Sequence, residues 1–326
     1  MTRQPSETLV TVIGASGFIG RHIVRALAKR GYRIRAACRR PDLAGHLQPL
    51  GVPGQIMPVQ ANVRYPASLD AVYAGADVVI NATGTDVSSG AQSFDAVLVF
   101  GAEAVAKAAR TARSRLLITV SGIGADRQGT SDAARAKGEG EARAAQEFPG
   151  AIAVRPSVVF GPEDRFFNKL AGMARFSPVI PVFGGGETRI QPVFVGDIAE
   201  AVARLVDKGV ADGRIYELGG PEVLTLRQLT QFTLDTTARK RMVIPIPFSV
   251  ARIIGMIAGL LPKPPITADQ VELLKSDNVV SEEANREGRT LKGLGIAASG
   301  IEGIVPSYLY RFRKAGQFTA PKGMPE

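Results

Sequence analysis

The chain has 326 residues, 45% hydrophobic and 21% charged, which is typical of a folded globular protein and excludes a disordered one. With a single cysteine, Cys38, and two histidines, His22 and His46, the chain lacks an internal disulfide and the usual ligands of a structural zinc. The formal net charge of +10 favours anionic partners such as nucleotides, phospholipid head groups or an acidic protein surface. Nucleic acid ranks last among these partners, because no stretch interleaves basic residues with aromatics for base stacking.

The chain opens with a few polar residues, 1–8, ahead of an apolar run. This is too short for a signal or transit peptide, so we expect the protein to act where it is made. Together with the lone cysteine, this favours a reducing, cytoplasmic location in a bacterium.

Runs rich in β-branched residues alternate with alanine-rich runs through the first half of the chain. This βαβ pattern predicts a doubly wound parallel sheet, whose ligands bind at the carboxyl ends of its strands. The predicted strands are residues 9–13, 33–38, 56–59, 78–81, 116–120 and 151–156. The predicted helices are residues 18–30, 67–74, 94–111 and 132–148.

Turn-forming residues dominate after Pro156, where glycine–proline and triple-glycine sequences appear. We therefore predict a nucleotide-binding domain over residues 1–160 and a smaller C-terminal α/β lobe over 161–318. A strand–helix unit at 193–208 and a strand at 214–218 are expected to return to the main sheet, so that the lobes interleave. Residues 319–326 are polar, contain two prolines and are expected to form a flexible tail.

A glycine-rich turn follows the first predicted strand and opens the first predicted helix. It reads Gly14-Ala15-Ser16-Gly17-Phe18-Ile19-Gly20. Glycines let the backbone turn sharply and approach a pyrophosphate, whose charge is stabilised by the helix N-terminus. In this strand–turn–helix context the motif predicts a dinucleotide-binding site rather than a merely structural turn.

The end of the second strand indicates which dinucleotide is bound. A site for NAD usually has a carboxylate there, about 20 residues beyond the glycines, whereas arginine accommodates the 2′-phosphate of NADP. Here the strand ends in Cys38-Arg39-Arg40, and no carboxylate appears before Asp42. The two guanidiniums predict NADPH as the cofactor, the alternative being that they lie on a solvated loop.

The G-x-x-G-x-x-G spacing resembles that of the extended short-chain dehydrogenase/reductase family, and the resemblance covers nearly the whole chain. It implies a Rossmann fold and NADP(H) binding. It also implies that segments after later strands line the cofactor site. These segments contain Asn62 and Val63, Asn81, Ala82, Thr83 and Gly84, Ser121, and Pro156 and Val158 in the 155–162 block.

Catalysis in this family needs a tyrosine four residues before a lysine that lowers its pKa. The matching segment places Lys137 well, but Ala133 occupies the tyrosine position. Loss of a positioned general acid lowers the rate by roughly 10²–10⁴-fold. Ser121 could still position a carbonyl group but is a poor acid. We therefore expect cofactor binding without turnover, unless a donor from elsewhere in the chain replaces the tyrosine.

Residues 248–261 form a predicted apolar helix bounded by prolines, with Val250, Ile253, Ile254, Ile257, Leu260 and Leu261 at helical spacing. At 1.5 Å per residue it is about 21 Å long, too short to cross a hydrocarbon core of about 30 Å. It can pack in the protein core, or lie against a membrane or a partner subunit.

Together these features resemble a bacterial form of an atypical group within the family, the NADPH-binding accessory subunits of respiratory complex I. The resemblance implies a non-catalytic subunit on the hydrophilic arm, peripheral to the cytoplasmic side of the inner membrane. Two alternatives remain. One is a soluble NADPH-dependent reductase, epimerase or quinone-pathway enzyme, and the other is a nucleotide sensor that binds its partner only with NADPH.

Overall fold

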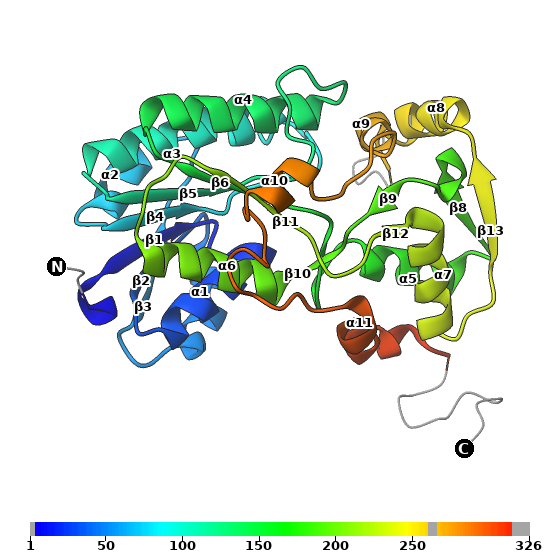
Figure 1. The fold of residues 1–326 in the computed structure, drawn as a ribbon, viewed down its shortest axis with the longest axis horizontal. Helices are drawn as coiled ribbons and strands as arrows, with labels where there is room; N and C mark the ends of the chain where they lie inside the picture. The colour runs from blue at the N-terminus through cyan, green and yellow to red at the C-terminus, as the bar shows by residue number, and fades with distance from the viewer. Residues whose placement is uncertain (1–3, 260–265, 315–326) are drawn as a thin grey trace. The chain divides into compact units, whose positions relative to one another are not determined.

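The computed structural model describes residues 4–259 and 266–314 and divides into two compact units (Figure 1). Unit 1 runs to Pro156 and also includes Val195–Leu218 and Val280–Ala297. Unit 2 comprises Ser157–Phe194, Gly219–Val279 and the chain from Ala298. The chain therefore passes between the units several times. The predicted tail at 319–326 lies outside the described residues.

Unit 1 is built on a seven-stranded parallel sheet of order β11-β6-β5-β4-β1-β2-β3. The direction of strand addition reverses between β1 and β4, and ligands of doubly wound sheets bind outside the strand ends at this point. Its strands are β1 (Leu9–Ile13), β2 (Arg33–Cys38), β3 (Ile56–Gln60), β4 (Val78–Asn81), β5 (Leu116–Val120), β6 (Ile152–Pro156) and β11 (Ile215–Leu218). This is the predicted Rossmann α/β fold.

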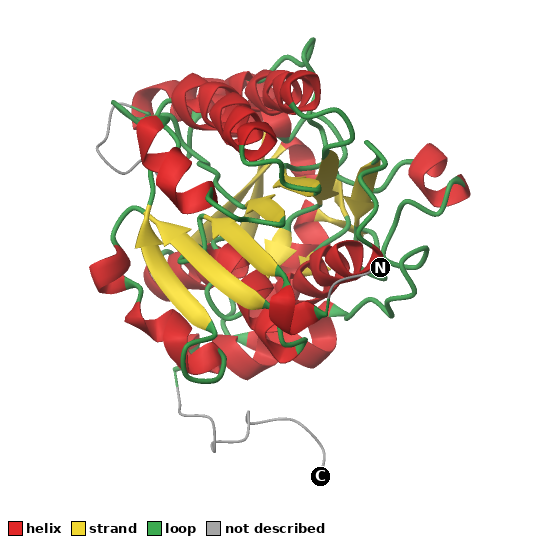
Figure 2. Cartoon of the chain, turned by 90° about the vertical axis from the view of Figure 1, so that its left-hand side faces the viewer, coloured by secondary structure: helices red, strands yellow, loops and turns green. Residues whose placement is uncertain are grey.

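Helices cover both faces of this sheet, as Figures 1 and 2 show. One face carries α2 (Ala67–Tyr73), α3 (Phe100–Thr111) and α4 (Asp132–Glu147), and the other carries α1 (Phe18–Lys29) and α6 (Val195–Lys208). The short helix α10 (Glu282–Arg286) also belongs to unit 1. Strands buried from both sides are continuously apolar, which is why β4 reads Val-Val-Ile before Asn81.

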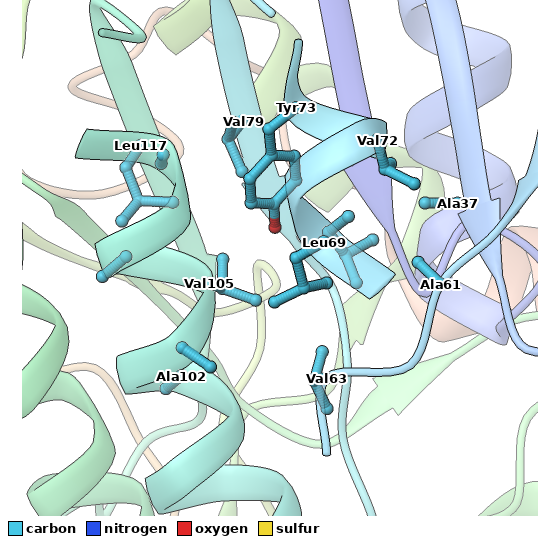
Figure 3. Close-up of a cluster of buried hydrophobic side chains, with 14 of the residues drawn as sticks. Ala37, Ala61, Val63, Leu69, Val72, Tyr73, Val79, Ala102, Val105 and Leu117 are labelled. Carbon is cyan, nitrogen blue, oxygen red and sulfur yellow. The ribbon is translucent and has the colours of Figure 1, made fainter. Parts of the chain in front are cut away.

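Small side chains allow the helices to approach the sheet closely. The core under α2 and α3 includes Leu69, Tyr73, Val79, Val105 and Leu117, together with many alanines (Figure 3). Burial of the Tyr73 ring raises the pKa of its phenol well above the usual value. This packed layer fixes the strand ends from which the site is built.

Most predicted elements of unit 1 match the structure to within a residue or two, and β1, β2, β4 and β5 match at both ends. The predicted helix 94–111 is wrong in its first turns. There a π-helix at Asp95–Val99 precedes α3. Hydrophobic periodicity does not distinguish an i→i+5 turn from an α-helical one, and such turns are frequent at functional sites.

Unit 2 has three two-stranded sheets and its own helices. Its paired strands are β7 (Val159–Phe160) with β10 (Val193–Phe194), β9 (Arg189–Ile190) with β12 (Leu224–Thr225), and β8 (Val179–Phe183) with β13 (Met242–Ile246). Its helices are α5 (Phe167–Phe176), α7 (Leu226–Thr236), α8 (Phe248–Ala258), α9 (Ala268–Leu273) and α11 (Ile301–Leu309). The strand expected at 193 therefore pairs within unit 2. Of the elements expected to return to the main sheet, β11 pairs with β6, and α6 belongs to unit 1.

Helix α8 is exposed along most of its apolar surface. Only Ala251 and Gly255 are buried, and a Cβ on Gly255 would lie 2.7 Å from the backbone nitrogen of Ala268 in α9. By contrast, Ile253 is 53% and Ile257 is 66% exposed. Of the two alternatives for this helix, the described part supports an interfacial surface rather than core packing. Leu260 and Leu261 lie outside the described residues.

Candidate nucleotide-binding site

The glycine-rich turn joins β1 to α1 as the motif predicts. The backbone N–H of Gly14 donates to the carbonyl of Ala37 in β2 at 2.9 Å. Gly14 has a φ of +79°, and a Cβ there would lie 2.7 Å from the carbonyl oxygen of Ala82. A Cβ on Gly20 would lie 2.1 Å from the carbonyl oxygen of Gly14. A larger residue at Gly14 would therefore push the turn away from the end of β4, and a larger residue at Gly20 would push α1 away from the turn.

The N-terminus of α1 is open to an anion. Gly17 is the N-cap, no side chain caps the helix there, and no acidic residue lies in its first turn. The first N–H groups of a helix have no partner inside the helix and carry the positive end of its dipole. This arrangement is suited to binding a pyrophosphate.

Two neighbouring cavities of unit 1 adjoin this turn. The glycine-loop cavity, of about 170 Å³, is lined by Ile13, Gly14, Ser16, Gly17, Cys38, Arg39, Ala61, Asn62, Val63, Arg64, Ala82, Thr83, Gly84, Gln92 and Val97. The lysine cavity, of about 150 Å³, is lined by Ile19, Asn81, Ala82, Thr83, Gly84, Thr85, Asp86, Val97, Leu98, Ala102, Thr119, Val120, Ser121, Lys137, Gly140 and Glu141. The residues common to both, Ala82–Gly84 and Val97, make them adjacent parts of one site.

The lining of the glycine-loop cavity contains two arginines, Arg39 and Arg64, and no carboxylate. Arg40 does not line it. Its guanidinium instead pairs with the carboxylate of Asp42, with an Nη2–Oδ2 distance of 2.7 Å, and both side chains are exposed. Of the two predicted guanidiniums, Arg39 is therefore the one at the cavity. A cavity with this charge suits a phosphorylated ribose better than a free 2′-hydroxyl.

Cys38 ends β2 at the wall of the same cavity and is a free, buried thiol. Burial raises the pKa of this thiol, and this effect exceeds the opposite effect of its hydrogen bond with Ser16. Because the thiolate is the reactive form, Cys38 is expected to be chemically inert at neutral pH.

Asparagines shape the turns after β3 and β4. Asn62 Oδ1 accepts the backbone N–H of Arg64 at 3.2 Å. Asn81 is buried, and its Oδ1 accepts both the backbone N–H and the hydroxyl of Thr83, at 3.1 and 2.6 Å. These bonds fix the two turns whose backbones border the cavities.

Two hydroxyls in the lysine cavity have no hydrogen-bond partner among the described residues. They belong to Thr119 and Ser121 of the β5 end, and Thr119 is only 8% exposed. A buried hydroxyl left unpaired costs about 1–3 kcal/mol, so these groups suit a polar ligand. Lys137 lies nearby, since its Nζ is 2.9 Å from where a Cβ on Gly122 would be.

The position where the family has its tyrosine is packed with apolar side chains. Ala133 is 5% exposed and belongs to a buried cluster with Phe94, Val99 and Ala136. Phe94 precedes the π-helix and Val99 is its last residue, and the same π-helix places Val97 at both cavities. Ala133 therefore belongs to a cluster of apolar side chains, none of which can donate a proton.

The predicted cofactor residues fall into four groups, three that line a cavity and one that does not. Gly14, Ser16, Gly17, Arg39, Asn62 and Val63 line the glycine-loop cavity, Ile19, Ser121 and Lys137 line the lysine cavity, and Ala82, Thr83 and Gly84 line both. Phe18, Gly20, Arg40 and Pro156 of unit 1 line neither cavity, and Val158 belongs to unit 2.

Sequence reasoning missed several lining residues, including Arg64, Gln92, Thr119 and Glu141. Glu141 is one turn beyond Lys137 and is held by Arg155, with an Nη2–Oε2 distance of 2.6 Å. Its spacing from Lys137 was the one available signal for this residue. The others lie on turns or inside strands, where no spacing rule points to a cavity.

Comparison with known proteins places the chain among nucleotide-binding proteins. The NAD(P)H-binding family matches residues 14–147. The chain is 33% identical over 323 residues to NADH dehydrogenase (ubiquinone) 1 alpha subcomplex subunit 9, mitochondrial, of Arabidopsis thaliana, covering 95% of this chain and 79% of the relative. It is also 35% identical over 198 residues to a ceramide reductase of Caulobacter vibrioides, covering 61% of this chain and 60% of the relative.

Among solved structures, the chain resembles an NADPH-dependent quinone oxidoreductase of Escherichia coli in complex with NADPH. The TM-score is 0.73 at 20% identity, covering 92% of this chain and 99% of that one. At this identity the likeness concerns the fold alone.

Proposed function

Because the chain belongs to the family of the NADH dehydrogenase alpha subcomplex subunit 9 proteins, we propose that it is an NADPH-holding accessory subunit of a membrane-associated NADH:quinone oxidoreductase. In this proposal the subunit docks on the hydrophilic arm of complex I, on the cytoplasmic side of a bacterial inner membrane. Its bound nucleotide stabilises the subunit and is not turned over.

One observation carries the proposal. The site retains the groups that would bind NADPH and lacks the one that would use it. The N-terminus of α1 would face the pyrophosphate, Arg39 the 2′-phosphate, and Lys137 with Ser121 the nicotinamide ribose. When bound to an active dehydrogenase, such a cofactor supplies a hydride, and the product then needs a proton. At the corresponding position this chain has Ala133 within an apolar cluster.

Exposed apolar side chains of α5, β13 and α8 in unit 2 support peripheral attachment. They are Phe176, Met242, Ile244, Val250, Ile253, Ile254, Met256 and Ile257. The basic residues Arg175, Lys240 and Arg252 are exposed beside them in sequence. No helix in the described ranges is long and apolar enough to cross a membrane. An amphipathic surface with flanking positive charge is suited to anionic lipid head groups, each well-placed basic residue contributing roughly 1 kcal/mol.

Native purification tests the assignment directly. The protein is purified gently from cells without added nucleotide, and the bound ligand and associated subunits are identified by mass spectrometry. We expect NADPH or NADP⁺ together with subunits of complex I in the membrane fraction. A wholly soluble monomer would contradict the subunit assignment.

Attachment through α8 has its own test. Ile253→Ser with Ile257→Ser should leave the protein folded with nucleotide bound, because both side chains are exposed. It should also release the protein from membranes washed in high salt, which weakens charge attraction but leaves apolar contacts. Leu43→Ser with Val52→Ser, each 67% exposed in unit 1, is the matched control. Equal retention of both variants on the membranes would exclude α8 from the attachment.

A second function, a reductase acting on a carbonyl compound, is favoured by one observation. The hydroxyls of Thr119 and Ser121 are buried in the lysine cavity with no hydrogen-bond partner in residues 4–259 and 266–314. They could hold a substrate oxygen while another group supplies the proton. A relative named as a ceramide reductase is consistent with such chemistry, although the match covers less of the chain than the match to the complex I subunits.

A further inference from the structure

The segment 84–93 borders both cavities of unit 1. Gly84 lines both of them, Asp86 lines the lysine cavity and Gln92 lines the glycine-loop cavity. Near the tip, Ser89 and Gln92 form an antiparallel bridge, with backbone N–O distances of 2.9 and 3.3 Å. The segment is therefore a strap with an ordered turn along the edge of the site.

Arg64 ties this strap to the turn after β3. Its Nη1 donates a hydrogen bond to the carbonyl oxygen of Ala91 at 3.0 Å. The guanidinium also lies over the ring of Tyr65, 5.6 Å from the ring centroid. Because Arg64 itself lines the glycine-loop cavity, the same side chain contacts the cavity and the strap.

The two ends of this contact differ in rigidity. The backbone of Arg64 is fixed by Asn62, whose side chain accepts its N–H, and Ser68 donates to the carbonyl of Asn62 at 3.1 Å. Ala91, by contrast, lies on an exposed stretch next to Gly90, which has a φ of +50°. A single hydrogen bond of this kind contributes a modest net stability and can break without unfolding the domain. The strap can therefore open when the bond to Arg64 breaks.

We infer that Arg64 is a latch that holds the 84–93 strap closed beside a bound dinucleotide and slows its release. The inference rests on the proposed function, since it needs a nucleotide in the glycine-loop cavity. A latch acts on the nucleotide whether or not the ribose carries a 2′-phosphate. Arg64 should therefore affect NADPH and NADH equally, whereas Arg39 should affect NADPH alone.

Stopped-flow displacement measures the release of NADPH and of NADH from the full-length protein. Arg64→Gln should raise both dissociation rates by the same factor, about three- to tenfold, the usual value of one hydrogen bond. Association rates should change little. Arg64→Lys, which keeps a donor and a charge, should recover part of the effect. Arg25→Gln, which removes an exposed arginine of α1, is the matched control and should leave both rates unchanged.

Hydrogen exchange separates a latch from a simple contact with the ligand. With saturating nucleotide, Arg64→Gln should speed exchange at the amide of Gln92 relative to wild type, because that amide pairs only while the strap is ordered. A rise in the release rate of NADPH alone would make Arg64 a phosphate ligand and overturn the latch. If Arg64→Gln releases both nucleotides at the wild-type rates, and the wild type does bind them, the latch is overturned as well. A wild type that binds neither nucleotide would instead overturn the proposed function.

Discussion

The two cavities of unit 1 differ in which side chains the sequence has retained. The glycine-loop cavity has the sharp turn at Gly14, the open N-terminus of α1 and the guanidinium of Arg39. The lysine cavity keeps Lys137 and Ser121, but Ala133, which belongs to an apolar cluster with Phe94, stands at the position of the family's tyrosine. The difference indicates that binding and catalysis are separable in this fold. In the proposed function, affinity for the nucleotide resides mainly in backbone geometry and charge, whereas turnover would depend on one side chain.

The largest expected effect is the stabilisation of the fold by its ligand. A ligand that binds only the folded state adds RT ln(1 + [L]/Kd), or about 4 kcal/mol when free ligand is 1,000 times Kd. NADPH should therefore raise the melting temperature by several degrees, as measured by calorimetry with and without nucleotide. A melting temperature that does not respond to millimolar NADPH would show that the glycine-loop cavity is not a nucleotide site.

Replacing Arg39 tests the specificity of that cavity. Arg39→Ala should lower the binding affinity for NADPH by about 1.5–3 kcal/mol, or about 10- to 150-fold, because a charge-assisted contact to the 2′-phosphate is lost. NADH affinity should barely change. Arg40→Ala is the matched control, since Arg40 is paired with Asp42 away from the cavity. Calorimetric losses of equal size for both nucleotides would contradict the assignment of Arg39.

Placing a tyrosine at position 133 tests whether the lysine cavity lacks only this one side chain for catalysis. Ala133→Tyr should destabilise the protein by about 1–3 kcal/mol, because a phenol must enter a packed cluster, and turnover should remain absent. Denaturant unfolding measures the loss. The double variant Ala133→Tyr with Phe94→Ala should recover part of the lost stability, because the tyrosine can use the space that Phe94 leaves. Phe94→Ala alone should be destabilising, because it leaves a cavity. If Ala133→Tyr is as stable as wild type, the cluster is not the obstacle.

The smallest expected effect concerns Cys38. Because burial raises the pKa of this thiol above its ordinary value near 9.0, its thiolate fraction should be low at neutral pH and rise only above that value. Alkylation, followed by mass spectrometry, should therefore be slow at pH 7.5 and faster at higher pH. Bound NADPH should slow it further by covering the cavity wall. Rapid alkylation unaffected by NADPH would place Cys38 away from the nucleotide.

Much of unit 1 follows from local sequence, because its strands are buried on both faces and its helices are amphipathic. The strand at Val78–Asn81 stands out as a short apolar run ending in a polar residue. The π-helix at Asp95–Val99 does not, since its side chains keep an apolar periodicity that α-helices share. The pairing of β10 with β7 depends on contacts in unit 2 that no local pattern encodes.

The site could be predicted only where a motif names it. The glycines follow from the strand–turn–helix order, Arg39 from its place at the end of the second strand, and Lys137 from its spacing to the missing tyrosine. Arg64 and Thr119 reach the cavities through the tertiary fold, which brings together strand ends that are distant in sequence. Arg40 instead pairs with Asp42, and the sequence signal for this ion pair is the carboxylate two residues beyond Arg40.

The central claim is that the protein holds NADPH without using it, and the absorbance of the bound nucleotide at 340 nm tests this most directly. The stoichiometric complex is followed over time with a panel of carbonyl compounds, including nucleotide sugars. We predict a constant absorbance throughout. A steady loss with any physiological carbonyl, abolished by Lys137→Ala or Ser121→Ala in protein that still binds NADPH, would contradict the claim and establish an enzyme.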